Sequence, residues 1–137
     1  GDPDNIWQVA KSGLLDAKEN NPYRFSIIAS GRGTNKMHVK VRFYDKDMKE
    51  LGISYVVAPT EEYNFDGVNF FGEYVSPPGS AHMRIDLLSQ QRPEQKTYWW
   101  VHDILLQDLE DYKKPNTFTM IKRMEKDTTA HVYARVL

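Results

Sequence analysis

Short runs of alternating apolar and polar residues are the dominant pattern of this chain. A period of two is typical of half-buried antiparallel strands, and Gly, Pro, Asn and Asp separate the runs, as turns require. Helical periodicity is weak throughout. The pattern predicts nine strands, at about residues 6–10, 23–30, 37–44, 51–58, 68–76, 80–88, 97–107, 117–124 and 130–136. So many short strands in one chain predict an all-β fold, an antiparallel sandwich or barrel.

Two connections carry specific turn chemistry. Asp45 and Asp47 follow a run of strand residues, and their side chains can accept hydrogen bonds from the backbone just downstream, which predicts a hairpin. Pro77-Pro78-Gly79 ends another strand, because proline fixes φ and cannot donate to a central ladder.

The alternation also assigns strand faces. Val39, Val41 and Phe43 point to one side of their strand and are expected in the core, which leaves the intervening residues on the other side. The same division makes Ala81, Met83, Ile85 and Leu87 core residues of a second strand, and Phe25, Ile27 and Ala29 core residues of a third. The opposite faces of these three strands carry cations, a tyrosine and a histidine: Arg24, Lys40, Arg42, Tyr44, His82 and Arg84.

If these strands share a sheet, this set forms a candidate surface for a glycan. Planar guanidinium groups donate to sugar hydroxyls and carboxylates, and aromatic rings stack on the apolar faces of pyranose rings. Four of the residues are cationic, which favours a uronic-acid or sulfated polysaccharide, while neutral glycans stay open. The alternative is that these are ordinary solvated positions on the wet face of an antiparallel sheet.

The segment Tyr98-Trp99-Trp100 is the most distinctive in the chain. Three consecutive aromatic residues on a strand cannot all face one core, so at least one of them lies on the opposite face or at an edge. If Trp100 packs with His102 and Ile104, the exposed residue is Trp99, which joins the candidate ligand-binding set. The alternative is that both tryptophans pack beneath loops.

Length and composition limit the classes of protein to which this chain can belong. The 137 residues are close to the size of one domain, and we expect a single domain over residues 1–137. A net charge of -1 gives no general attraction to nucleic acid, and we expect no nucleic-acid partner. The sequence has no run of about 18 apolar residues, so no membrane partner is expected, and the residues at its start do not resemble a signal peptide. Because cysteine is absent, disulfides and zinc–thiolate sites are excluded.

The sequence matches none of the common catalytic motifs. It has no nucleophile elbow, phosphate loop or His-Glu-x-x-His helix, and the four histidines lie singly on separate predicted strands. Adjacent carboxylates such as Glu61-Glu62 fall in predicted loops, where they are expected to be solvated. We therefore expect a non-catalytic domain.

Several segments together resemble the galactose-binding-like jelly-roll carbohydrate-binding modules. The resemblance covers about residues 20–108. It rests on Tyr23-Arg-Phe-Ser26, on the hairpin of residues 39–51, on Phe71-Gly-Glu-Tyr-Val75 with the Pro-Pro-Gly turn and the strand after it, and on Trp100-Val-His-Asp-Ile-Leu-Leu106. Two features depart from the family. His102 replaces the first acidic residue of the closing motif, and the opening strand with its Asn and Glu is not evident.

The resemblance implies a jelly-roll sandwich that binds a polysaccharide or oligosaccharide. It implies an ancillary domain of a larger, secreted or cell-surface protein, where the partner would be a catalytic domain. It also implies one structural calcium ion with Asp103 as a candidate ligand, although Asp103 could equally bond the backbone near a strand end. The alternative function is a structural or protein-interaction sandwich of a multidomain enzyme, phage or cell-surface assembly.

Overall fold

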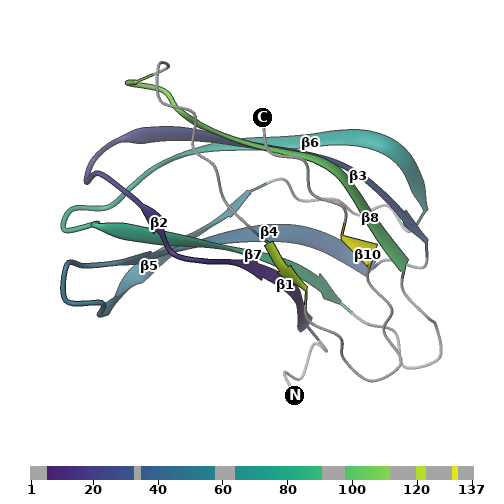
Figure 1. The fold of residues 1–137 in the computed structure, drawn as a ribbon, viewed down its shortest axis with the longest axis horizontal. Coiled ribbons are helices and arrows are strands. Elements are labelled where there is room, and N and C mark those ends of the chain that lie inside the picture. The colour runs from purple at the N-terminus through teal and green to yellow at the C-terminus, as the bar shows by residue number, and fades with distance from the viewer. Residues whose placement is uncertain are drawn as a thin grey trace.

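The computed structural model describes residues 6–32, 35–57, 64–90, 98–111, 120–122 and 131–132, and all the elements within them are strands. The strands form two sheets that lie face to face (Figure 1). No helix that could cross a membrane occurs in these described segments. The fold is therefore a β-sandwich, as the alternation predicts.

Sheet A contains the strands on one side of the sandwich. Its order is β5 (Glu50–Val57), β4 (Asn35–Tyr44), β7 (His82–Gln90), β1 (Ile6–Ser12) and β9 (Met120–Lys122), and the short β2 (Leu15–Asp16) also pairs with β7. Sheet B has the order β10 (His131–Val132), β8 (Tyr98–Asp108), β3 (Pro22–Arg32) and β6 (Phe65–Val75). All pairs are antiparallel except β10 with β8, which is parallel.

Most predicted strands match observed ones to within a few residues. The exception is β2, whose two residues are too few for an alternating pattern to reveal. The last two predicted ranges, 117–124 and 130–136, contain β9 and β10 and extend beyond the described residues.

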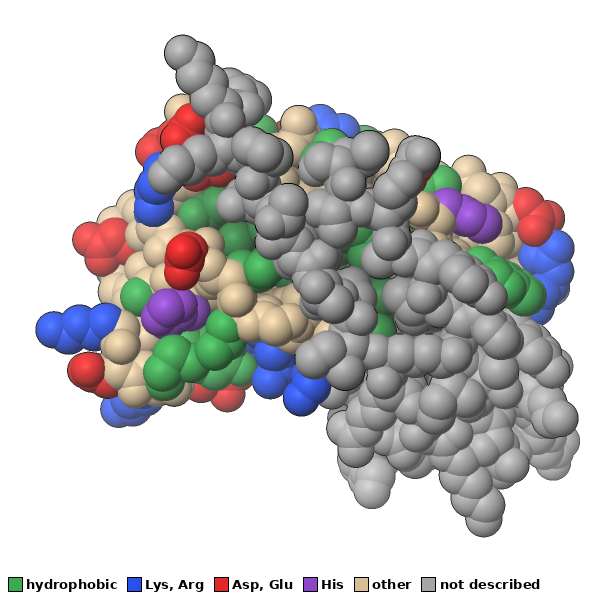
Figure 2. Space-filling view, viewed as in Figure 1, with side chains coloured by type: hydrophobic (Ala, Val, Ile, Leu, Met, Phe, Trp, Pro, Cys, Tyr) green, Lys and Arg blue, Asp and Glu red, His purple; other side chains and the backbone are tan. Residues whose placement is uncertain are grey.

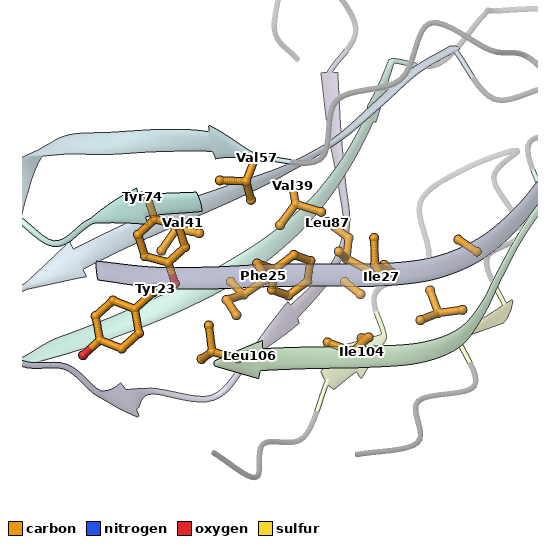
Figure 3. Packing of buried hydrophobic residues seen from close by; sticks show 14 of the residues in the cluster. Tyr23, Phe25, Ile27, Val39, Val41, Val57, Tyr74, Leu87, Ile104 and Leu106 are labelled. Carbon is orange, nitrogen blue, oxygen red and sulfur yellow. The ribbon is translucent and has the colours of Figure 1, made fainter. Parts of the chain in front are cut away.

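The core fills the space between the sheets with every second residue of the long strands. Phe25 and Ile27 of β3 and Ile104 and Leu106 of β8 face side chains of sheet A, as Figure 3 shows. The sheet A contribution includes six residues predicted from alternation, each fully buried: Val39, Val41 and Phe43 of β4 and Met83, Ile85 and Leu87 of β7. Ala81, also predicted to point inward, lies just before β7 and is half-buried. Burial of each such side chain stabilises the fold by about 1.5–3 kcal/mol.

Four aromatic rings join the two sheets at one end of the sandwich. Tyr74 of β6 stacks on Tyr23 of β3 at a centroid distance of 5.6 Å and contacts Phe43 of β4 at 5.8 Å. Its ring also stacks on Tyr55 of β5 at 6.0 Å. The Tyr74 hydroxyl donates to Met83 Sδ at 3.4 Å, and burial raises the pKa of this phenol well above its ordinary value. The cluster thus links strands that are distant in sequence.

Both predicted turns are present. Asp45 Oδ1 accepts hydrogen bonds from the backbone N–H groups of Asp47 and Lys49, each at 2.9 Å, which closes the hairpin between β4 and β5. Ser80 N donates to Pro77 O at 3.2 Å, and Gly79 has a φ of 85°. Proline at the second position and a left-handed glycine at the third are the features of a type II turn.

Candidate functional site

The structure divides the predicted ligand-binding residues between two faces. Lys40, Arg42 and Tyr44 lie on β4, and His82 and Arg84 lie on the neighbouring β7, all on the face of sheet A that points away from the core. Arg24 lies on the outer face of sheet B, because β3 pairs with β6 and β8 and not with β4. The expectation of one surface is thus correct for five of these residues and wrong for Arg24.

The sheet A residues lie in register across the two strands. Arg42 is directly opposite Arg84, and Tyr44 is directly opposite His82. Between the arginines lies Asp86, which is fully buried and accepts hydrogen bonds from Arg42 Nε and Arg84 Nε, both at 2.8 Å. The hydrogen bond to Asp86 raises the pKa of Arg84. Burial lowers the pKa of Arg42, but hydrogen bonds to Asp86 and Glu50 outweigh it and raise the pKa overall.

The outer face of sheet B presents a second set of residues, which we call the β3 face. Its members come from three adjacent strands: Asn69, Phe71 and Glu73 of β6, Arg24, Ser26 and Ile28 of β3, and Asp103, Leu105 and Gln107 of β8. The register aligns them in three rows, Glu73–Arg24–Gln107, Phe71–Ser26–Leu105 and Asn69–Ile28–Asp103. The first row therefore combines an anion, a cation and an amide. Each of the other two rows combines apolar side chains with side chains that form hydrogen bonds.

Phe71 is the aromatic centre of the β3 face. Its side chain is 55% exposed although it lies in the middle of an 11-residue strand. The Arg24 guanidinium carbon lies 4.5 Å from the ring centroid, a cation–π contact, and Arg24 Nη1 lies 3.8 Å from Glu73 Oε1. These contacts hold a cation and a carboxylate beside an accessible ring.

Sequence reasoning missed Phe71, although a signal for it exists. Phe70 and Phe71 are adjacent on a strand, so they must point to opposite faces. Phe70 packs against the core, where its ring contacts Phe65 at 5.2 Å, and this leaves Phe71 outside. The argument applied to Trp99 and Trp100 would have found it.

The faces of the tryptophan segment follow from a β-bulge. The register of β3 and β8 shifts between Ile28 and Ala29, which inserts His102 as an extra residue, so Val101 and Ile104 are both buried. Trp100 is half-buried opposite Ser30, on the outer side of sheet B, and does not share a face with Ile104. The premise for exposing Trp99 is therefore wrong. The backbone of Trp99 pairs with Gly31, while its side chain lies outside the described residues.

The bulge also gathers polar groups at one end of the β3 face. Ser30 Oγ accepts a hydrogen bond from Gly67 N at 2.8 Å and lies 2.9 Å from His102 Nε2. Because the Ser30 oxygen already accepts from Gly67, its hydroxyl hydrogen is available to His102. The two side chains add a hydroxyl and an imidazole to the surface beside Trp100.

Asp103, the predicted calcium ligand, lies on the β3 face in the middle of β8, and its neighbour across on β3 is the apolar Ile28. Calcium takes six to eight oxygen ligands. Among the described residues, no group of three or more His, Cys, Asp or Glu side chains is placed to hold a metal ion. An ion at Asp103 stays a prediction, since calcium also takes backbone carbonyl oxygens as ligands.

Charge is mixed on the face of the molecule that Figure 2 shows. Figure 2 shows acidic and basic side chains interspersed at both ends of the visible face. This distribution agrees with the net charge of -1.

Comparisons with known proteins add little to this geometry. No family model and no curated protein matches the chain. Among solved structures, the chain is similar to the enzymatically active domain of tailspike protein 4 of bacteriophage CBA120 (14% identity, TM-score 0.48, 74% of this chain and 15% of that one). It is also similar to a Glycosylation Associate Protein complex from Streptococcus agalactiae (12%, 0.47, 68% and 25%).

A third similar structure holds the CBM22-1 and GH10 modules of endo-1,4-β-D-xylanase 10B from Clostridium thermocellum, in complex with xylohexaose (10% identity, TM-score 0.48, 81% of this chain and 19% of that one). The chain thus spans a quarter or less of the length of each of these three proteins. At such identities and TM-scores the similarities carry no argument about function.

Proposed function

We propose that this domain binds a polysaccharide through the β3 face and breaks no bond. The observation that supports the proposal best is the exposed Phe71 ring in the middle of a strand, surrounded by side chains that donate and accept hydrogen bonds. An exposed aromatic ring in such a position stabilises no core. It suits a ligand that has both an apolar face and many hydroxyl groups.

Saccharides have this combination of surfaces. The C–H face of a pyranose ring can pack on Phe71, whose ring is already held in place by Arg24. Hydroxyl groups around the sugar ring can bond the amides of Asn69 and Gln107 and the carboxylate of Glu73. Trp100 and His102 at the far end of the face would extend the contact along a chain of several sugars.

Charge favours a neutral saccharide on this face. Arg24 lies beside Glu73, so the row that contains the one described arginine of the β3 face also contains a carboxylate. The sequence-based expectation of an acidic glycan rests on treating four cations, Arg24, Lys40, Arg42 and Arg84, as one group. These residues belong to two different sheets. The reason for expecting an acidic ligand therefore applies to sheet A alone.

The rival function is a structural or protein-interaction sandwich. A surface that packs against a protein is expected to contain a broad apolar patch with few donors. On the β3 face, hydrogen-bonding side chains occur in all three rows, which favours the saccharide.

The proposed setting follows from the family resemblance. It is an ancillary jelly-roll domain of a larger secreted or cell-surface protein, beside a catalytic domain that acts on the same glycan. A structural calcium ion at Asp103 belongs to the same proposal. It predicts that calcium raises the melting temperature of the domain and that a chelator reverses the rise. An unchanged melting temperature would exclude the ion.

An affinity-gel screen tests the binding proposal. The domain is run through gels that contain neutral or acidic polysaccharides, beside Phe71→Ala and the control Val56→Ala, which removes a side chain that is 58% exposed on β5 of sheet A. We expect a neutral polysaccharide to retard the domain and the control, with affinity about tenfold lower for Phe71→Ala, equivalent to ~1.4 kcal/mol. Equal retardation of all three proteins by the neutral polysaccharide would exclude Phe71 as the contact. No retardation in any gel would favour the interaction domain.

A further inference from the structure

Sheet A has its own concentration of oriented cationic groups on its outer face. Arg42 and Arg84 are direct cross-strand neighbours, an arrangement that costs stability when two like charges face each other. Asp86 offsets this repulsion, because its carboxylate is fully buried and accepts hydrogen bonds from both guanidinium groups. The three residues form a unit, which we call the arginine pair with its buried carboxylate.

The buried carboxylate fixes the orientation of both guanidinium groups. Asp86 Oδ2 accepts from Arg42 Nε at 2.8 Å and from Arg84 Nη2 at 3.0 Å, and Asp86 Oδ1 accepts from Arg84 Nε at 2.8 Å. Arg42 Nη1 also donates to Glu50 Oε1 at 3.2 Å. None of these bonds uses Arg42 Nη2 or Arg84 Nη1. The side chains of Arg42 and Arg84 remain 29% and 26% exposed. Each guanidinium group is therefore fixed in orientation and still partly accessible to solvent.

The neighbouring positions add to the positive charge. Lys40 and Lys11 lie on either side of Asp86 in the same row of the sheet. Glu50 and Asp16 lie at the margin, where Asp16 Oδ1 is 3.8 Å from His82 Nδ1. In the described part of this face, four cations thus lie near three carboxylates. The cations are Arg42, Arg84, Lys40 and Lys11, and the carboxylates are Asp86, Glu50 and Asp16. Asp86 is fully buried, so the carboxylates exposed to solvent are those of Glu50 and Asp16. Tyr44 and His82 continue the surface beside the arginines.

We propose that the arginine pair is a binding site for an oxyanion carried by a saccharide, either a uronate carboxylate or a sulfate ester. Guanidinium groups donate two parallel N–H bonds to such anions, and a buried partner that holds the fork in advance reduces the entropy lost on binding. The site is on the opposite side of the sandwich from the β3 face. The inference rests on the proposed function only in taking the carrier of the anion to be a glycan.

The test measures binding of the domain to polygalacturonate, which carries carboxylates, and to heparin, which carries sulfates, at low and physiological salt. Arg84→Gln removes one fork, and Lys46→Gln makes the same change of charge at an exposed position of the β4–β5 turn. We expect Arg84→Gln to weaken binding at least tenfold and Lys46→Gln to change it less than twofold. Arg84→Lys serves if the glutamine variant does not fold, and we expect a similar loss because lysine lacks the planar fork.

The outcomes separate the possible sources of the anion. Binding to polygalacturonate alone assigns the carboxylate, and binding to heparin alone assigns the sulfate. Equal losses in Arg84→Gln and Lys46→Gln would overturn the proposal, because net charge would then explain the binding, and so would failure to bind either polymer. Phe71→Ala should leave this binding unchanged, so failure of the β3 face and failure of the arginine pair are seen in different experiments.

Discussion

Asp86 is the residue whose role the alternating pattern conceals most. The pattern places it on the outer side of β7 with His82 and Arg84, where a carboxylate is expected to be solvated. In the folded chain it is fully buried beneath two arginines. The sequence shows that Arg42 and Arg84 are both outward-facing, but only the register of β4 and β7 shows that they converge on one carboxylate.

Replacement of Asp86 tests this role in stability. Asp86→Asn keeps the shape of the side chain and removes its charge, which leaves two partly buried guanidinium groups without an anion between them. We expect the free energy of unfolding to fall by about 2–3 kcal/mol, measured by urea denaturation. Asp47→Asn, on the exposed β4–β5 turn, is the matched control and should change stability by less than about 0.5 kcal/mol. Equal small effects of both changes would contradict the role assigned to Asp86.

At the scale of elements, the ends of three strands of sheet B meet at Asp108. Its Oδ1 accepts from Asn21 Nδ2 at 2.9 Å, and from the backbone N–H groups of Glu110 and Asp111 at 2.9 and 3.1 Å. Asn21, just before β3, also accepts a hydrogen bond from Ser76 N, just after β6, and donates its own backbone N–H to Ser76 Oγ, both at 3.0 Å. This network therefore fastens β3, β6 and β8 to one another at one end of the sheet.

The network predicts a pH dependence of stability. Burial alone would raise the pKa of Asp108, but the hydrogen bonds from Asn21, Glu110 and Asp111 outweigh it and hold the pKa below its ordinary value of 3.8. A lowered pKa in the folded state means that the ionised carboxylate stabilises the fold above that value. This contribution is lost as the pH falls through the folded pKa.

Urea denaturation between pH 6 and pH 2.5 measures this effect. The wild-type domain should lose stability as the pH falls below about 4, the range in which unfolded aspartate titrates. Asp108→Asn should lose less over the same range, because it has no charge to lose at that site. Parallel curves for the two proteins would show that Asp108 makes no contribution to the pH dependence.

Local patterns predicted the positions of the strands well, but they did not predict which strands pair with one another. Alternation identified the core residues of β3 and β4, because each of these strands has one face buried, and those of β7, although Asp86 and Leu88 on the other side of β7 are buried as well. It failed in β8, where the bulge at His102 changes which side Trp100 occupies. It also could not tell that β3 belongs to the other sheet from β4, because strand pairing depends on contacts between residues far apart in sequence.

For the whole molecule, Tyr74 is a link between the two sheets. Its ring lies among Tyr23 of sheet B and Phe43 and Tyr55 of sheet A. Among the described residues its hydroxyl donates to a thioether sulfur, which is a weak acceptor. Packing should therefore matter much more than the hydroxyl.

A pair of variants separates the two contributions of Tyr74. Tyr74→Phe keeps the ring and should change the free energy of unfolding by less than about 1 kcal/mol, whereas Tyr74→Ala should lower it by about 3–5 kcal/mol. Thermal and urea denaturation followed by circular dichroism measure both. A loss in Tyr74→Phe as large as that in Tyr74→Ala would contradict the assignment and show that the hydroxyl is the main contribution.

The β3 face and the arginine pair lie on opposite sides of one sandwich, so the location of a bound neutral saccharide tests the β3 face on its own. The most direct measurement is an amide chemical-shift titration of the isotope-labelled domain with an oligosaccharide of the neutral polysaccharide that retards it. We predict that the largest shifts fall on β3, β6 and β8, around Arg24, Ser26 and Phe71. Shifts confined to β4 and β7 with a neutral saccharide, or no shifts at millimolar ligand, would contradict binding through the β3 face.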